Sequence, residues 1–132
     1  MTAEELIEKY TAGKRDFIGV DLEGLSLRST NLSGSNLSGA NLTNAVPGAA
    51  NFRRANLRGA NLRGANLAGA DLTGADLRGA IFDKSIIVGV NFEDANLEGA
   101  ILFYSTERNM TFYRNTVMPN GGVEIGPYTH YC

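Results

Sequence analysis

The sequence predicts an all-β solenoid, in which the chain winds into stacked coils and turns once in every five residues. Three observations support this prediction: a five-residue repeat, an apolar residue at the centre of almost every repeat, and a glycine two residues after most centres. A period of five fits neither a strand, whose side chains alternate between two faces, nor a helix, on which successive centres would step by roughly 140°. Burying every fifth residue therefore requires one change of direction per repeat.

The repeat is most regular at residues 55–79, which read ANLRG ANLRG ANLAG ADLTG ADLRG. The central position keeps its register from Phe17 to Leu102, and only Pro47 interrupts the series of apolar centres. Alanine lies two residues before many centres and is small enough for the backbone to turn inward. Glycine follows where the turn needs a positive φ angle or a close approach of the neighbouring backbone.

These A(N/D)LxG units resemble the pentapeptide-repeat family over about residues 15–106. The resemblance implies a right-handed quadrilateral β-helix with four pentapeptides in each coil. The family has diverse roles, so the resemblance predicts the fold much more specifically than the function. Counted in this way, the chain is expected to form about five coils: residues 15–34, 35–54, 55–74, 75–94 and a partial coil from 95.

One compositional regime runs through the 132 residues, and we therefore expect a single domain. Residues 1–14 are expected to form an N-terminal capping helix, residues 15–106 the β-helix, and residues 107–132 a C-terminal cap, hairpin and tail. Residues 116–125 predict the hairpin, because two apolar segments flank a Pro-Asn-Gly-Gly turn. Residues 126–132 are expected to be a loose tail.

The N-terminal residues contain a helix-capping signal. Thr2 and Glu5 have the spacing of a capping box, which predicts the start of a short helix. Its apolar side chains are Leu6, Ile7 and Tyr10, which we expect to lie over the first coil as a lid, because the end of a solenoid exposes its interior. A membrane-surface role is the alternative, and the acidic character of the segment argues against it.

Two features of the repeats could have a local function as well as a structural one. Pro47 replaces an inward leucine, so one face is expected to bulge or bend there, either as a tolerated irregularity or as a binding notch. The second is a series of Asn and Asp residues, which could form a ligand ladder but is expected to bond the nearby turn backbone. This series includes Asn31, Asn36, Asn41, Asn51, Asn56, Asn61, Asn66, Asp71 and Asp76.

The pattern loosens toward the C-terminus, where isoleucine takes the Asn/Asp place at Ile81, Ile86 and Ile101. Ile81 and Ile101 are expected to be neighbours in one column. This end is either the start of a C-terminal cap or an association surface, which predicts a monomer or a weak end-to-end dimer. Farther on, the register predicts that Phe112 and Val117 point inward, while Tyr113 and Met118 point outward.

Charge and hydropathy exclude several classes of protein. The 12 basic and 14 acidic residues give a formal net charge of -2, which argues against a general polyanion-binding protein and against a strongly acidic surface. No apolar stretch is long enough to span a membrane, and residues 1–13 are too charged for a secretory signal. We therefore expect a cytoplasmic protein without a membrane partner.

The sequence predicts no catalytic, cofactor-binding or metal site, and therefore no enzyme and no small-molecule substrate. His130 is the only histidine and lies near the only cysteine, Cys132, with no third ligand to complete a metal or catalytic site. The glycines recur for turning, and none forms a phosphate-binding loop before a helix. A β-helix filled by leucine and alanine also leaves no interior cavity.

Any specificity must therefore reside in the outward residue after each centre. Arginines cluster among the middle repeats and acidic residues follow from Asp83, so the rod is expected to be basic at its middle and acidic below. Two interpretations remain open: a solvated surface that keeps the protein soluble, or a docking patch for an acidic partner. The candidate protein-binding residues are Arg53, Arg58, Arg63 and Arg78, with Arg58 and Arg78 stacked on one face and the other two on the flanking faces.

Two functions are considered for a protein with this sequence pattern: a binding scaffold and a DNA mimic. The first is a non-enzymatic scaffold or regulator that presents this patterned surface to an unknown protein partner. The second comes from the resemblance, since some family members mimic DNA and bind DNA gyrase. The arginines and the near-neutral charge argue against this function. A nucleic-acid partner is not expected either. A weaker resemblance, carried by Arg15-Asp16-Phe17 and a Met-Pro-Asn-Gly turn, is to small cyanobacterial members, some of which regulate development through protein contacts.

Overall fold

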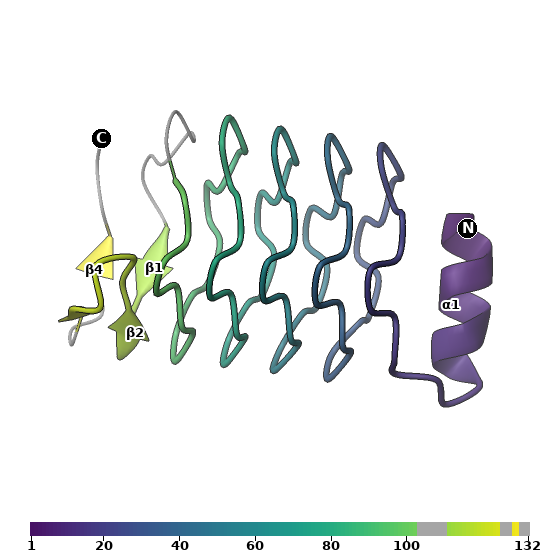
Figure 1. The fold of residues 1–132 in the computed structure, drawn as a ribbon, viewed down its shortest axis with the longest axis horizontal. Coiled ribbons are helices and arrows are strands. Elements are labelled where there is room, and N and C mark those ends of the chain that lie inside the picture. Colours follow the sequence, from purple (N-terminus) through teal and green to yellow (C-terminus); the bar gives the residue numbers. More distant parts are fainter. Residues whose placement is uncertain (103–110, 125–127, 130–132) are drawn as a thin grey trace.

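The computed structural model describes residues 1–102, 111–124 and 128–129. A helix lies at one end of a stack of coils, and short strands lie at the other end (Figure 1). No helix in these described residues is long and apolar enough to cross a membrane. The helix is α1, Ala3–Thr11, and the strands are β1, Phe112–Tyr113, β2, Thr116–Val117, β3, Val123–Glu124, and β4, Tyr128–Thr129.

Parallel bridges between residues twenty apart join each coil to the next, as between Asp16 and Asn36 and between Asn56 and Asp76. The amide of Leu57 donates to the carbonyl of Asp76 at 2.7 Å, and equivalent bonds recur along the stack. Four repeats therefore complete one coil, which is the spacing that the family resemblance implied. Each coil is held by backbone hydrogen bonds to the coils on either side.

The stack has four faces, each made of one repeat from every coil. Residues on the same face are neighbours although they lie twenty apart in the sequence. The central residues of face 1 are Phe17, Leu37, Leu57, Leu77 and Leu97; those of face 2 are Leu22, Leu42, Leu62, Phe82 and Leu102; those of face 3 are Leu27, Pro47, Leu67 and Ile87; and those of face 4 are Leu32, Phe52, Leu72 and Phe92.

The interior is filled by these central residues together with the alanines that precede them. Leu57 and Ala60, for example, are fully buried. Each buried leucine contributes about 1.5–3 kcal/mol by the apolar area it removes from water. The glycine that ends each regular repeat has a positive φ angle, 71° at Gly79, as its turn position predicted. Each regular repeat thus places a small residue and a large apolar residue in the interior and a glycine at the turn.

The Asn and Asp series bonds the turn backbone, as predicted. Its side-chain oxygen accepts a hydrogen bond from the amide two residues later, at 3.0 Å from Asn61 to Arg63 and 3.1 Å from Asn31 to Ser33. Such contacts satisfy amides that the turn would otherwise leave unpaired. They also fix the backbone of the residue whose side chain points outward.

The prediction of a bulge or bend at Pro47 is wrong. Pro47 is buried at the centre of its repeat. Hydrogen bonds on both sides of it keep the ladder in register: Val46 donates to the carbonyl of Leu25 at 2.8 Å, and Ala49 donates to that of Ala68 at 2.9 Å. Proline has no amide hydrogen, so the face loses only the bond that a different residue would donate to the Asn66 carbonyl.

Helix α1 begins with the predicted capping box, in which Thr2 and Glu5 bond each other's backbone amides at 3.1 Å. Leu6 is buried, and Tyr10 is half-buried and donates its hydroxyl to the Ser33 carbonyl at 2.6 Å. The prediction that Ile7 lies on the first coil is wrong, because its side chain is 43% exposed.

Helix geometry explains the position of Ile7. Ala3, Leu6 and Tyr10 share one side of α1 and pack against the core. Ile7 lies roughly 70° around the helix from the middle of that side, given 100° per residue. The Ile7 side chain therefore stays outside the contact between α1 and the core. Ala3 takes the place in this contact that was predicted for Ile7.

The register shifts by one residue before β1. Phe112 pairs with Asn91 and Val117 pairs with Asn96, each 21 residues apart, whereas Ile81 and Ile101 still pair at twenty, as predicted. As a result Tyr113 is the buried residue of β1, and it stacks on the ring of Phe92 with 5.4 Å between ring centroids.

The predictions for this end are therefore wrong: Tyr113 points inward, and Phe112 and Val117 are only half-buried. Met118, expected to point outward, is half-buried and packs against the core. The physical reason is one additional residue between Ile101 and Phe112, which moves every later side chain by one position.

The predicted hairpin is confirmed, because β2 and β3 pair antiparallel around residues 118–122. Strand β4 pairs antiparallel with β1, so the segment expected to be a loose tail contributes a strand at Tyr128–Thr129. Residues 103–110, which belong to the predicted end of the β-helix and the predicted C-terminal cap, lie outside the described residues, as do His130 and Cys132.

Candidate interaction surface

The structure places the four predicted arginines on three adjoining faces. Arg58 and Arg78 follow the central residues of face 1, Arg63 follows that of face 2, and Arg53 follows that of face 4. Their guanidinium groups are therefore presented outward from neighbouring coils at about the strand spacing of 4.8 Å. This arrangement agrees with the stacking inferred from the register.

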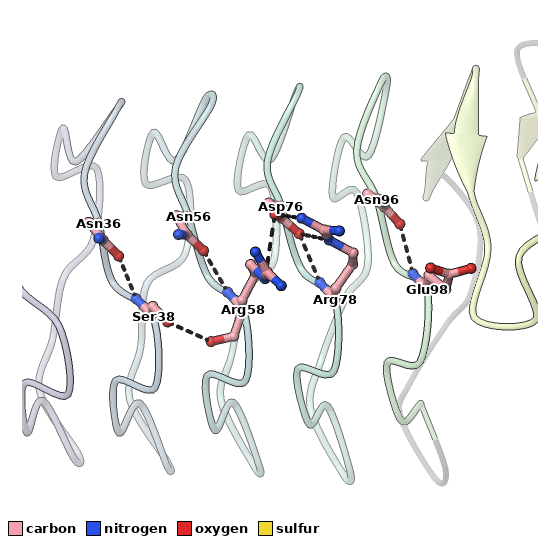
Figure 2. Close-up of polar contacts among 8 residues, drawn as sticks. All are labelled: Asn36, Ser38, Asn56, Arg58, Asp76, Arg78, Asn96 and Glu98. Atoms are coloured by element: carbon pink, nitrogen blue, oxygen red, sulfur yellow. Dashed lines mark hydrogen bonds and ion pairs between the residues drawn. The ribbon is translucent and has the colours of Figure 1, made fainter.

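Face 1 shows how the outward residues are held (Figure 2). Along this face, the side-chain oxygen of each Asn or Asp accepts a hydrogen bond from the amide two residues later, at 3.0–3.2 Å. The backbone beneath Arg58 and Arg78 is thereby fixed both by the coil ladder and by these local bonds. The four pairs are Asn36 with Ser38, Asn56 with Arg58, Asp76 with Arg78, and Asn96 with Glu98.

Every one of the four arginines has an aspartate partner. Arg78 bonds Asp76 in its own repeat, at 2.7 Å from Nη2 to Oδ2. The other three reach the next coil, and their charges are partly neutralised there. These pairs are Arg58 with Asp76 at 3.9 Å, Arg53 with Asp71 at 3.1 Å, and Arg63 with Asp83 at 3.6 Å.

Sequence reasoning missed these aspartates as partners. Asp71 and Asp76 each lie 18 residues after an arginine, and Asp83 lies 20 residues after one. In a coil of twenty residues both spacings bring the side chains together on adjacent coils. An arginine and an aspartate at these spacings are therefore the signal that could have found the pairs.

The pairing perturbs the carboxylates. Hydrogen bonds from the Arg78 guanidinium lower the pKa of Asp76, against an opposing effect of burial, and the Arg78 amide and the charges of Arg78 and Arg58 lower it further. At Asp71, burial raises the pKa, but hydrogen bonds from Thr73 and Arg53 outweigh it, so that the pKa is lowered. Both carboxylates therefore stay charged beside the arginines at neutral pH.

The arginines remain accessible despite these pairs. Their side chains are 41–54% exposed. Ion pairs at such exposure contribute little stability, with a typical range of about 0–1 kcal/mol. A carboxylate from another molecule could therefore exchange with the internal partner at small cost.

Among the described residues, no group of three or more His, Cys, Asp and Glu side chains is placed to hold a metal ion. The interior is occupied by apolar side chains. The outward residues are thus the part of the surface that can carry specificity.

Comparison with known proteins agrees with the repeat geometry. The family model for pentapeptide repeats matches residues 16–46 and 50–87 with 8 copies. Among solved structures, a pentapeptide repeat protein from Nostoc Pcc 7120 is 41% identical, with 82% of this chain and 77% of that one covered and a TM-score of 0.33. None of the curated proteins compared matches the chain.

Two further structures are similar. Rfr23, a pentapeptide repeat protein from the cyanobacterium Cyanothece 51142, is 27% identical, with 87% of this chain and 97% of that one covered and a TM-score of 0.56. A pentapeptide repeat protein from the thylakoid lumen of Arabidopsis thaliana is 36% identical over 69% of this chain, with a TM-score of 0.46. The chain spans 57% of the length of that plant protein.

The family match covers more than half of the chain, and the twenty-residue coils are those of the family's right-handed quadrilateral β-helix. Repeat sequence, coil spacing and structural similarity lead to one assignment. The chain belongs to the pentapeptide-repeat family.

Proposed function

We propose that this chain is a non-enzymatic scaffold or regulator that binds an acidic protein partner. Its β-helix of about five coils, covered at one end by α1, acts as a rigid rod. The partner-binding residues are Arg53, Arg58, Arg63 and Arg78. The observation that carries the proposal is that these four exposed guanidinium groups lie on adjoining faces of one fixed backbone.

Three physical features support a protein partner. Arginine presents a planar fork of donors that suits carboxylates, and its charge is kept at all physiological pH values. The backbone under Arg58 is fixed by the Asn56 side chain, so little conformational freedom is lost there on binding. Finally, the exposed ion pair between Arg58 and Asp76 is long, at 3.9 Å, and therefore weak enough to exchange.

A DNA mimic that binds gyrase is the second candidate, and an acidic stretch at Asp83, Glu93, Asp94 and Glu98 is the observation in its favour. Mimicry of a duplex needs a negative surface along the rod. Here four arginines interrupt that surface and the formal net charge is only -2. An unchanged gyrase supercoiling reaction at high concentrations of this protein would remove the candidate.

The scaffold proposal is tested by a pull-down from a native lysate, with bound proteins identified by mass spectrometry. The test variant replaces Arg53, Arg58, Arg63 and Arg78 with Glu. The control variant replaces four other exposed cations, Lys9, Lys14, Lys84 and Arg114, with Glu, which changes the net charge equally. Circular dichroism checks that both variants fold.

We expect the native protein and the control variant to retain a partner that the test variant does not retain. Retention by the test variant would place the site elsewhere on the rod. Loss from both variants would mean that overall charge, and not these four positions, controls the interaction.

A further inference from the structure

Two adjoining hollows open where the C-terminal end of α1 meets the coils. The first, of about 470 Å³, is lined by Arg15, Arg53 and Arg54 together with Tyr10 and Gly34. The second, of about 570 Å³, shares Tyr10 and Arg15 and adds Arg28. Of the described residues that line either hollow, none is acidic. Four arginines thus gather at one end of a chain whose formal net charge is -2.

Most of this positive charge is not neutralised internally. Among the described residues, Arg28, Arg54 and Arg15 form no ion pair, and only Arg53 has a carboxylate partner, Asp71. In this respect the hollow differs from face 1, where both arginines share Asp76. An uncompensated positive potential is therefore expected here, around two arginines, Arg15 and Arg54, that lie outside the set predicted from the sequence.

Arg15 is held in place at the edge of the hollow. Its guanidinium carbon lies 3.6 Å from the centroid of the Tyr10 ring. One terminal nitrogen donates to the carbonyls of Tyr10 at 2.7 Å and Lys14 at 2.9 Å. Its other guanidinium N–H groups have no partner among the described residues. Stacking and two hydrogen bonds fix the group, while the remaining donors are available to a ligand.

Arg54 occupies a position where most repeats have glycine. Its φ angle is 57°, in the left-handed region that costs stability for a residue with a side chain. The coil on one side of it has Gly34, where an added Cβ would find nothing within 4 Å. The absence of a side chain at Gly34 leaves the space of the hollow open beside Arg54. An unfavourable backbone conformation and an open space thus coincide with an unpaired guanidinium group.

We infer that the first hollow is a binding site for a phosphate group, held by Arg15, Arg53 and Arg54. A phosphate group offers more acceptor oxygens than a carboxylate and can receive donors from several guanidinium groups at once. The hollow is larger than a single phosphate, so it can also accept the atoms to which the phosphate is attached. This site goes beyond the proposed scaffold function, since two of its three arginines lie outside that set.

The same group could come from a free phosphorylated compound or from a phosphorylated side chain of a protein. Pyrophosphate and a short phosphoserine peptide represent the two sources. Unphosphorylated and aspartate versions of the peptide serve as controls for general charge. Amide NMR shifts and calorimetry, both at constant ionic strength, follow the binding to the intact protein.

Two variants isolate the site. Arg54→Asn removes one charge and keeps a residue that tolerates the left-handed conformation, and Gly34→Asn fills the hollow without changing the charge. Lys84→Asn is the matched control, because Lys84 is an exposed cation at the same repeat position of another face, with φ of 59°. All three substitutions are therefore compatible with the backbone as it stands.

We expect saturable binding of at least one phosphorylated probe, with the largest shifts at the amides of Ser33, Gly34 and Arg54. Arg54→Asn and Gly34→Asn should each weaken binding at least tenfold, and Lys84→Asn should not. Preference for pyrophosphate identifies a free compound, and preference for the phosphopeptide identifies a protein, both through this site. Equal binding of the aspartate peptide, equal loss in the control variant, or no saturable binding would overturn the inference.

Discussion

Asp76 accepts two hydrogen bonds from the guanidinium group of Arg78, at 2.9 and 2.7 Å, while Arg58 from the preceding coil lies 3.9 Å from the same carboxylate (Figure 2). One aspartate therefore serves two arginines stacked on one face. This relationship links the surface charge of the rod to its stability, because the folded protein holds the pKa of Asp76 below its ordinary value of 3.8.

A pH dependence of stability follows from the lowered pKa values of Asp76 and Asp71. A carboxyl group with a lower pKa in the folded state adds stability above its ordinary pKa, and that contribution is lost as the pH falls through the folded value. The free energy of unfolding of the native protein, measured with urea, should therefore fall more steeply below pH 4 than that of a variant with Asp71→Asn and Asp76→Asn. Parallel curves for the two proteins would contradict this prediction.

Replacing Pro47 with leucine should stabilise the fold. The new amide can donate to the Asn66 carbonyl, and a hydrogen bond of this kind contributes about 0.5–1.5 kcal/mol. Without proline the unfolded chain gains conformational entropy, which reduces this gain in stability by about 0.4–1 kcal/mol. The leucine also buries more apolar area than proline, which adds to stability. The expected net gain is about 1 kcal/mol in the free energy of unfolding, measured with urea.

The reverse change tests the same explanation. Leu67 lies one coil away from Pro47 on face 3 and donates its amide to the carbonyl of Ile86 at 2.8 Å. Leu67→Pro should lower the free energy of unfolding by more than about 2 kcal/mol, because it removes this bond and part of the core packing. If Leu67→Pro were neutral, the ladder bond would not explain the behaviour of Pro47.

Ser85 should be a destabilising residue. It occupies the inward position where most repeats have alanine, and its buried hydroxyl has no hydrogen-bond partner within the described ranges. Ser85→Ala removes an unsatisfied polar group, and should raise the free energy of unfolding by about 1 kcal/mol. Ala65→Ser, at the equivalent position of the preceding coil, should lower it by a similar amount. A loss of stability in Ser85→Ala would mean that the hydroxyl is satisfied.

Leu6 and Tyr113 are buried at opposite ends of the coil stack (Figure 1), and the contribution of each side chain to stability can be tested. Tyr113 is buried and stacks on Phe92, so Tyr113→Ala should reduce the free energy of unfolding by about 3–5 kcal/mol. Leu6→Ala at the other end should cost about 2–5 kcal/mol. Phe112 is only half-buried and is the control for Tyr113. A larger effect at Phe112 than at Tyr113 would contradict the shifted register.

Local rules explain what could be predicted from the sequence. A central apolar residue and the Asn or Asp before it, as at Leu57 and Asn56, recur every five residues. Their roles depend only on residues within one repeat or on the equivalent residues of neighbouring repeats. The central column and the side-chain bonds of the turns therefore follow from the pattern. The capping box at Thr2 is also local, since its two partners lie three residues apart.

Features that join distant segments could not be predicted in the same way. The inward position of Tyr113 depends on one additional residue before β1, which no local motif marks. The exposure of Ile7 depends on the rotation of α1 against the first coil. The hollow beside Arg54 needs Tyr10 and Arg15 to reach another coil, and that meeting exists only in three dimensions.

The most direct test of the scaffold proposal is site-specific photocrosslinking in the native lysate. A photoreactive amino acid would replace Ser38, which precedes Arg58 on face 1, or Ala68, an exposed residue on face 3. Ser38 tests the arginine surface without removing an arginine, and Ala68 reports contacts on the opposite side of the rod. A scaffold that binds its partner through the arginines should give a discrete crosslinked partner from position 38 and none from position 68. The same partner from position 68 alone would contradict the proposal.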